Sequence, residues 1–369
     1  MQESLLDWYG QKKRGLPWRR VADPYPIWLS EIMLQQTRVE TVVSYWTRFL
    51  SFFPTVQSLA DAPEQAVLKA WEGLGYYSRA RNLKRCAERL VAEYGGAFPN
   101  TIEALQKLPG IGPYTAGAIA SIAFGVPTPA IDGNVERVLS RLLGIREDVG
   151  IPSVRRYLFE QAKNLIPKDR PGEFNQALME LGSLVCQPAP KCDQCPVGSF
   201  CDACGAGDAD ALPVKQKKAP QREVARGVAL VFYQKKVLLY RRTERLLQGL
   251  WCYPGFDGIA SGKTFDGIKS CMAVDERKSG EIISEVKSGE AVEKELRALG
   301  ISARFIQNVG QARHAFTHII WNMELLHFEA DSASCPEGWR WADEKEIALL
   351  PLPTAVRAAT EVVRQILEK

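Results

Sequence analysis

Histidine is nearly absent from this chain of 369 residues. Only His314, His318 and His327 occur, so residues 1–313 contain none. This absence excludes a Ser–His or Cys–His nucleophile, and any histidine acid or base, from most of the chain. Chemistry in that part must rely on carboxylates, tyrosine, lysine or a cofactor.

Long apolar runs and a secretion signal are also missing. No apolar stretch approaches the roughly 20 residues of a membrane helix, and the N-terminus lacks the charged-then-apolar order of a signal peptide. The nine cysteines are an odd number, which argues against a disulfide framework. The net charge of +4 permits nucleic-acid binding without requiring it. We therefore expect a cytoplasmic protein that binds no membrane.

A tight glycine turn precedes a lone carboxylate in the first half of the chain. Gly110 and Gly112 bracket an isoleucine, and Pro113 opens an apolar helix expected over residues 114–124. Such a turn exposes backbone amides that suit a DNA phosphate. Asp132 then lies in an apolar stretch, where it is either a helix N-cap or a functional anion. The local pattern alone does not separate these two interpretations.

Four cysteines follow a C-x5-C-x2-C-x5-C pattern. They are Cys186, Cys192, Cys195 and Cys201. Four thiols this close in sequence indicate a metal site, and their spacing is compatible with structural zinc or with a [4Fe–4S] cluster. Cys204 follows outside the pattern, either as an additional ligand or as a spare thiol.

Composition divides the chain into two domains and a linker. Residues 1–205 are predicted to be mainly helical. Residues 206–223 change from Gly, Ala and Asp to Pro and basic residues, which is typical of an interdomain linker. Residues 224–369 mix β-rich runs with helices and predict an α+β domain. Within it we expect a hairpin over residues 228–242 and a long surface loop over residues 257–289.

These motifs together resemble the helix–hairpin–helix DNA glycosylases, and most closely the MutY adenine DNA glycosylases. The resemblance rests on the glycine/proline-rich aspartate motif at residues 108–137, the S-E-x-M-L-Q-Q-T segment at residues 30–37, the cysteine loop and the C-terminal domain. It implies a multidomain fold, in which an all-α helix–hairpin–helix glycosylase domain with a [4Fe–4S] cluster loop precedes an α+β Nudix-like domain. The first two cysteines of the loop stand one residue closer together than in those proteins.

The resemblance assigns the catalytic chemistry to two carboxylates. Cleavage of an N-glycosidic bond needs an acid that protonates the leaving base and an anion that stabilises the sugar cation. Glu31, among apolar residues that raise a carboxyl pKa, is implied as the acid, with an ordinary helix glutamate as the alternative. Asp132 is implied as the anion, and Asn134 would orient it.

Tyr114 is implied to line the same pocket, and it also predicts the subclass. Glycosylases that additionally cut the strand carry a lysine here, whose amine forms a Schiff base with the sugar, whereas a phenol cannot. We therefore expect a monofunctional enzyme that leaves an abasic site. The alternative is that Tyr114 is only a packing residue and that a lysine elsewhere in the chain forms the Schiff base.

Residues expected to contact DNA come from both domains. Base flipping leaves a gap that a side chain must fill, and the lesion opposite the adenine must be read. The candidates are Arg19 at the base pocket, Gln36 and Tyr76 as wedges, Gly110 and Gly112 at a phosphate, and Phe316, Thr317 and His318 where MutY proteins carry a Phe-Ser-His loop that reads 8-oxoguanine. The expected partner is double-stranded DNA with A opposite 8-oxoguanine or G, bound by a monomer.

The Nudix-like domain is expected to bind rather than to hydrolyse. The position of the Nudix motif's Arg carries Glu293, and the positions of its three metal-holding acids carry Lys294, Arg297 and Ala298. None of these three is acidic, and the Lys and Arg would repel Mg²⁺ rather than hold it. Two further functions stay open on the sequence alone. One is an endonuclease III-like glycosylase/lyase for oxidised pyrimidines, and the other is a non-catalytic iron–sulfur protein that binds DNA or senses redox state.

Overall fold

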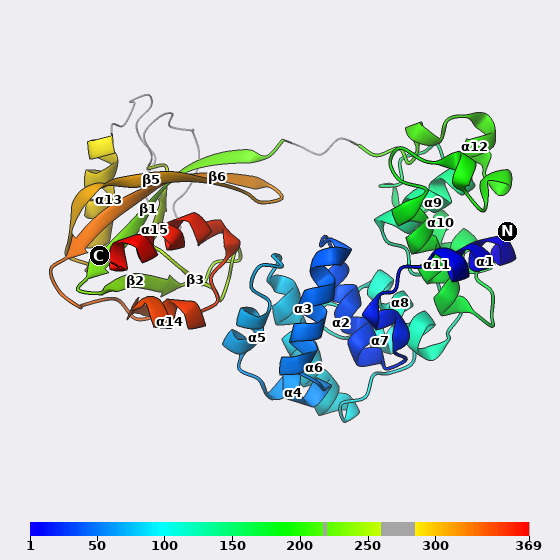
Figure 1. Cartoon of the computed structure of the whole chain (residues 1–369), viewed down its shortest axis with the longest axis horizontal. Coiled ribbons are helices and arrows are strands. Elements are labelled where there is room, and N and C mark those ends of the chain that lie inside the picture. The colour runs from blue at the N-terminus through cyan, green and yellow to red at the C-terminus, as the bar shows by residue number, and fades with distance from the viewer. Residues whose placement is uncertain (217–219, 260–284, 369) are drawn as a thin grey trace. The chain divides into compact units, whose positions relative to one another are not determined.

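A computed structural model describes residues 1–216, 220–259 and 285–368, which fall into two compact units (Figure 1). The first unit comprises residues 1–62 and 79–218, and the second comprises residues 63–78 and 219–369. Most of the expected surface loop over residues 257–289 lies outside the described residues. The first unit is helical and the second is α+β, as the sequence predicted.

Eleven helices of the first unit are described. They are α1 (Gln2–Lys12), α2 (Pro24–Leu34), α3 (Val39–Phe52), α4 (Val56–Asp61), α6 (Ser78–Tyr94), α7 (Ile102–Gln106), α8 (Pro113–Phe124), α9 (Gly133–Leu142), α10 (Pro152–Leu165), α11 (Pro171–Leu184) and α12 (Asp202–Ala206). In Figure 1, α1 and α9–α12 gather in one group, and α2–α4 with α6–α8 gather in another.

The first of these groups has its own apolar core. Val135, Val138, Leu139 and Leu142 lie on one face of α9 because they repeat at helical spacing. They pack against buried residues of α1, α10 and α11. The start of α9, and with it Asp132, is therefore held by a packed helical core rather than by a free loop.

The glycine turn and α8 take the form that the sequence predicted. Gly112 is the N-cap, Pro113 occupies the first turn, and Gly125 ends the helix in the left-handed conformation. The small residues of α8 allow a close approach of the chain. A Cβ on Gly117 would lie 2.2 Å from the carbonyl oxygen of Pro129, so no larger residue fits there without movement.

The second unit is built on a mixed sheet with the order β3-β2-β1-β6-β5, in which β4 pairs with β1 and β7 with β2. The strands are β1 (Arg222–Tyr233), β2 (Lys236–Arg241), β3 (Trp251–Cys252), β4 (Gly255–Asp257), β5 (Ala303–Ala315), β6 (Ile319–Ala330) and β7 (Trp339–Ala342). The predicted hairpin is confirmed, with Phe232 opposite Val237. Strand β1 also runs parallel to β6, with Arg222 opposite Ile319.

Helices cover both faces of this sheet. Alternate β1 residues point to opposite sides, so Val228 and Leu230 join a core with α15 (Arg357–Leu367), while Ala229 and Val231 pack against α13 (Glu285–Ala298). The unit also contains α5 (Glu64–Ala70) and α14 (Glu344–Leu349).

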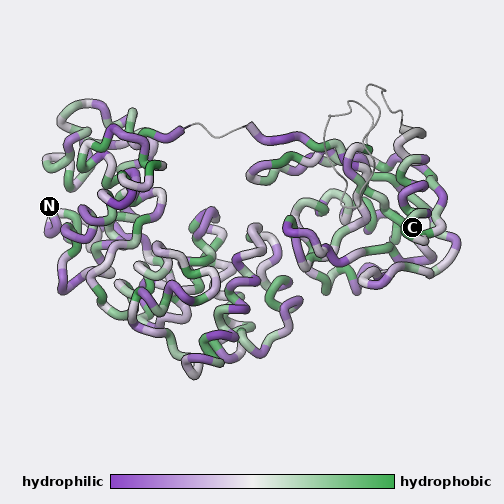
Figure 2. The backbone as a smooth tube through the Cα atoms, turned by 180° about the vertical axis from the view of Figure 1, so that it is seen from behind, coloured by the Kyte–Doolittle hydropathy of each residue, from purple (hydrophilic) through white to green (hydrophobic). Residues whose placement is uncertain are grey.

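Hydrophobic residues occur along the elements of both units in short stretches broken by hydrophilic ones (Figure 2). Among the residues that the structure describes, no helix has the length and apolar character needed to cross a membrane.

Candidate active site

A cavity of about 850 Å³ in the first unit collects all four predicted catalytic residues. Helices α2, α8, α9 and α11 and the segment before α2 form its wall. The predicted residues that line it are Arg19, Glu31, Gln36, Tyr114, Asp132 and Asn134. Two carboxylates far apart in sequence therefore face one cavity.

Glu31 is a buried carboxyl in the middle of α2, where only 5 % of the residue is exposed. The Tyr114 hydroxyl donates a hydrogen bond to Glu31 Oε2. Burial raises the pKa of Glu31 to about 7, the nearby charge of Asp132 adds to this rise, and the Tyr114 hydrogen bond opposes it. A carboxyl with this pKa holds a proton near neutral pH and can donate it.

Asp132 is the N-cap of α9, so the capping interpretation of the sequence is also true of the fold. Its Oδ1 accepts from the backbone N–H groups of Asn134 at 2.9 Å and Val135 at 2.7 Å. Its Oδ2 accepts from Asn134 Nδ2 at 3.0 Å. Burial raises the pKa of Asp132 above its ordinary value, whereas these three N–H donors and the charge of Arg137 lower it. The same hydrogen bonds fix the direction of the carboxylate.

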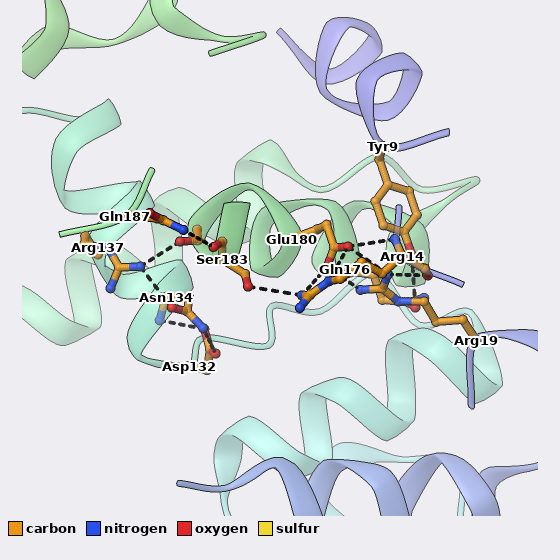
Figure 3. Close-up of polar contacts among 11 residues, drawn as sticks. Tyr9, Arg14, Arg19, Asp132, Asn134, Arg137, Gln176, Glu180, Ser183 and Gln187 are labelled. Carbon is orange, nitrogen blue, oxygen red and sulfur yellow. Dashed lines mark hydrogen bonds and ion pairs between the residues drawn. The ribbon is translucent and has the colours of Figure 1, made fainter. Parts of the chain in front are cut away.

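Arg137 connects this carboxylate to the cysteine loop. Its Nη2 donates to Asn134 Oδ1 at 3.0 Å and to the Gly182 carbonyl at 2.8 Å, and its Nε donates to the Cys186 carbonyl at 2.8 Å. Asn134 is thereby held from both sides, by Asp132 and by Arg137 (Figure 3).

A second polar network, which sequence reasoning missed, lies along α11. Arg14 and Arg19 donate to the carboxylate of Glu180 at 2.7 and 2.8 Å. Although burial alone would raise it, the hydrogen bonds from Arg14 and Arg19 hold the pKa of Glu180 at about 2. Arg14 also donates to Ser183 Oγ at 3.1 Å, and the Tyr9 hydroxyl donates to Gln176 at 3.2 Å (Figure 3).

The spacing of this network was a readable signal. Gln176, Glu180 and Ser183 lie three and four residues apart, which places them on one face of a helix. Four cavity-lining residues, Arg14, Gln176, Glu180 and Ser183, were therefore missing from the sequence-based site.

Gln36 lies in the turn between α2 and α3 and has a positive φ of 56°. Its side chain is exposed and lines the cavity. Arg79 supports this turn by donating from Nη1 to the carbonyls of Ile32, Met33 and Gln35. Gly110, in the glycine turn, has a φ of 77°, and a Cβ there would meet Asn82 at 2.7 Å.

The other predicted DNA contacts lie in the second unit. Phe316, Thr317 and His318 form the turn between β5 and β6, closed by a hydrogen bond of 2.8 Å from Phe316 N to the Ile319 carbonyl. Tyr76 belongs to the same unit and also has a positive φ, of 46°. Its hydroxyl lies 2.8 Å from Thr317 Oγ1, and both residues are exposed. The predicted site residues thus divide into two groups, one in each unit.

The four pattern cysteines line one small cavity together with Cys204. All five are free thiols, and Arg141 lies against them, with Nη1 3.4 Å from Cys186 Sγ. Within the described part of the chain, no three Cys, His, Asp or Glu side chains are placed to hold one metal ion. Four thiols that line one cavity are the side chains that either a structural zinc or a [4Fe–4S] cluster would use.

Helix α13 carries Glu293, Lys294, Arg297 and Ala298, the positions that the sequence aligns with the Nudix motif. Glu293 is engaged within the fold, accepting from Arg297 at 3.1 Å and from the backbone of Phe305 at 3.2 Å. Its carboxylate is thus already paired with protein donors.

Comparisons with known proteins find relatives for both the N-terminal and the C-terminal part of the chain. Residues 29–167 match the model of the HhH-GPD superfamily of base excision DNA repair proteins, and residues 227–362 match the NUDIX domain. The adenine DNA glycosylase of Homo sapiens is 35 % identical over 421 aligned positions, which cover 97 % of this chain and 73 % of that protein. The adenine DNA glycosylase of Buchnera aphidicola subsp. Schizaphis graminum is 37 % identical over 69 % of this chain and 74 % of its own. A thermostable thymine-DNA glycosylase superposes with a TM-score of 0.51 and 29 % identity, over 56 % of this chain and 95 % of its own.

Proposed function

Because the chain belongs to the adenine DNA glycosylases of the HhH-GPD superfamily, we propose that it removes adenine lying opposite 8-oxoguanine or guanine in duplex DNA and leaves an abasic site. The observation that carries this proposal is the pairing of two carboxylates in one cavity, one protonated near neutral pH and one held by N–H donors. A cavity of about 850 Å³ has room for a flipped base.

In the proposed reaction Glu31 supplies the proton. It passes from the Glu31 carboxyl to N7 of adenine, and the C1′–N9 bond breaks with its electron pair going to the base. Tyr114 donates to Glu31 Oε2, which orients the carboxyl, and burial raises the pKa of this phenol well above its ordinary value. Tyr114 therefore keeps its own proton while Glu31 gives one up.

Asp132 would then act on the sugar. Its negative charge stabilises the cation that develops at C1′, and Asn134 with the start of α9 holds it in place. Water adds to C1′, and its proton passes to a carboxylate of the cavity, which leaves neutral adenine and an abasic site. No lysine is needed for this sequence of steps, which agrees with a monofunctional enzyme.

The protein would divide the recognition of the pair between its two units. We assign Arg19 to the base pocket, Gln36 and Tyr76 to the gap left by the flipped base, and Gly110 and Gly112 to a phosphate. The turn of Phe316, Thr317 and His318 is assigned to 8-oxoguanine. Cys186, Cys192, Cys195 and Cys201 would hold a [4Fe–4S] cluster, which would order the loop after α11 and supply electron-transfer capacity when bound.

A single assay tests this function. Duplexes with A opposite 8-oxoguanine, G or T are incubated with the protein, and strand breaks are measured before and after treatment with alkali. We expect breaks at the adenine only after alkali, fastest opposite 8-oxoguanine. Breaks without alkali, together with a borohydride-trapped adduct, would instead identify a glycosylase/lyase. Absence of base release from every duplex would leave only a binding role.

A further inference from the structure

Glu180 is a buried carboxylate of the cavity to which the proposed reaction gives no task. It lies on α11, and only 1 % of the residue is exposed. Its two oxygens accept five hydrogen bonds of 2.7 to 3.2 Å, three from Arg14 and two from Arg19. Although burial would raise the pKa of Glu180, these donors hold it at about 2. Glu180 is therefore charged at neutral pH and is a poor acid or base, which leaves it the task of holding other groups.

Arg19 is held on several sides by this arrangement. Its Nη1 and Nη2 donate to the Glu180 carboxylate, and Nη1 also donates to the Arg14 carbonyl at 3.1 Å. Its guanidinium lies 5.4 Å from the centre of the Tyr9 ring. An arginine side chain has several rotatable bonds and would adopt many conformations without such partners. The contacts thus fix one conformation of Arg19 at the cavity.

The ion pairs join two parts of the cavity wall. Arg14 and Arg19 belong to the segment between α1 and α2, whereas Glu180 on α11 lies 161 positions after Arg19. Figure 3 shows both arginines reaching the same carboxylate. A wall that is fixed before DNA binds needs less ordering when a base enters the cavity.

The position of these charges favours a functional role over a purely structural one. Buried ion pairs seldom stabilise a fold more than apolar residues of similar size would. Arg14, Arg19 and Glu180 all line the cavity, which they share with Glu31 and Asp132. They therefore place oriented N–H groups at the surface that a flipped base would meet.

We propose that Glu180 is a positioning residue that, itself fixed by Arg14, aims Arg19 at the flipped adenine and so sets how tightly the cavity holds that base. Glu180 exchanges no proton and forms no bond to the substrate. This inference rests on the proposed function, in which Arg19 belongs to the base pocket.

Binding to two duplexes tests this role. One duplex carries 2′-fluoro-2′-deoxyadenosine opposite 8-oxoguanine, because the fluorine destabilises a cation at C1′ and so prevents excision. The other carries a tetrahydrofuran abasic analogue opposite 8-oxoguanine and offers no base to the cavity. Glu180→Gln should bind the first duplex about 10-fold more weakly than the parent, because charge-assisted hydrogen bonds that orient Arg19 are lost. It should bind the second duplex as the parent does.

Glu173→Gln is the matched control. Glu173 lies on the same helix and pairs with Arg170, but both side chains are 46 % exposed, and neither residue lines the cavity. This variant should bind both duplexes like the parent. Glu180→Asp keeps the charge on a shorter side chain and should recover part of the affinity that Glu180→Gln loses.

Arg19→Met shows whether the effect passes through Arg19. The double variant Arg19→Met/Glu180→Gln should bind the fluorinated duplex as weakly as Arg19→Met alone, because Glu180 then has no Arg19 to aim. A further loss in the double variant would contradict the proposal.

Two other results would overturn the role of Glu180 while the parent still excises adenine. An equal loss of affinity for both duplexes in Glu180→Gln would mean that Glu180 only supports the fold. An unchanged affinity for the fluorinated duplex would mean that base binding does not depend on Glu180. A parent that excises no adenine would overturn the proposed function as well, so the two failures are distinguishable.

Discussion

Glu31 has to be protonated for the proposed chemistry, and its burial raises its pKa enough to keep the proton near neutral pH. The excision rate should therefore fall as the pH rises through about 7, where the Glu31 carboxyl loses its proton. It should also fall at acid pH, where Asp132 becomes neutral. Single-turnover excision rates measured from acid to alkaline pH should show a bell-shaped dependence on pH. Glu31→Gln should lower the maximum rate about 10²–10⁴-fold. A flat alkaline side would exclude Glu31 as the acid.

The raised pKa of Glu31 has a cost for the fold. A carboxyl whose pKa rises from 4.5 to about 7 on folding binds its proton more tightly in the folded state. The contribution of this proton to the free energy of unfolding is therefore full at pH values below 4.5, and it is lost as the pH rises through about 7. Glu31→Gln removes this loss, so its free energy of unfolding should exceed that of the parent by about 1–3 kcal/mol at pH 8. Urea unfolding at pH 5 and pH 8 measures this. A difference that does not grow with pH would contradict the shift.

Asp132→Asn separates the charge of this side chain from its capping role. An asparagine oxygen can still accept the N–H groups of α9, whereas it carries no charge for the sugar cation. Binding of a duplex with A opposite 8-oxoguanine should stay within a few fold of the parent, while adenine release should fall by at least about 10³-fold. Equilibrium binding and single-turnover excision are measured on the same duplex. Turnover near that of the parent would remove Asp132 from the mechanism.

At the scale of elements, the close approach of α11 to α9 positions Asn134, which holds the carboxylate proposed to act in catalysis. A Cβ on Gly182 would lie 2.8 Å from Asn134 Cβ. Gly182→Ala should therefore push Asn134 away from Asp132 and reduce the excision rate about 10-fold or more. This loss is expected even though alanine has a higher helix propensity than glycine. Gly10→Ala is the matched control, because nothing lies within 4 Å of its Cβ. It should leave activity unchanged and add up to about 1 kcal/mol of stability. Equal activity of the two variants would show that α9 and α11 tolerate the added methyl.

Element boundaries were predictable where local chemistry sets them. Gly112-Pro113 and Gly125 bound α8 through capping preferences, and the β1–β2 hairpin follows from its two β-rich runs. Helix α11 escaped prediction even though its Pro171 start is a normal signal, because its inward face mixes apolar residues with Gln176 and Glu180. Those polar residues become intelligible only with Arg14 and Arg19, more than 150 positions away in sequence.

At the scale of the whole molecule, the residues proposed for catalysis and those proposed for lesion reading lie in different units. The double variant Thr317→Ala/His318→Ala should lower the preference for A opposite 8-oxoguanine over A opposite G by roughly tenfold or more, since one polar base contact is worth about 1–3 kcal/mol. Excision opposite G should change much less, because Glu31 and Asp132 are untouched. Single-turnover rates on both duplexes measure the ratio.

Tyr76→Phe is the companion variant, since it removes only the hydroxyl that lies 2.8 Å from Thr317 Oγ1. A smaller loss of preference is expected from it. An unchanged preference in the Thr317/His318 double variant would place lesion reading elsewhere on the chain.

The sequence indicated two domains, and it named Glu31, Asp132 and Tyr114, which the fold gathers in one cavity. It did not indicate that residues 63–78 group with the C-terminal residues, because that depends on contacts between segments far apart in the chain. The contact between Tyr76 and Thr317 was not indicated by the sequence for the same reason. Motifs specify local chemistry, whereas such pairings are set by tertiary packing.

The cap that Asp132 forms on α9 has a consequence for cells that carry altered copies of this protein. Asparagine would keep the helix capped, so an inert protein would persist at normal abundance and, if it binds as proposed, would occupy mismatched sites and shield them from other repair enzymes. Alanine would lose the cap, at about 1 kcal/mol, and part of the protein would be removed by proteolysis. Two equally inactive alleles would then differ in severity, and the one with more surviving protein would be the more harmful.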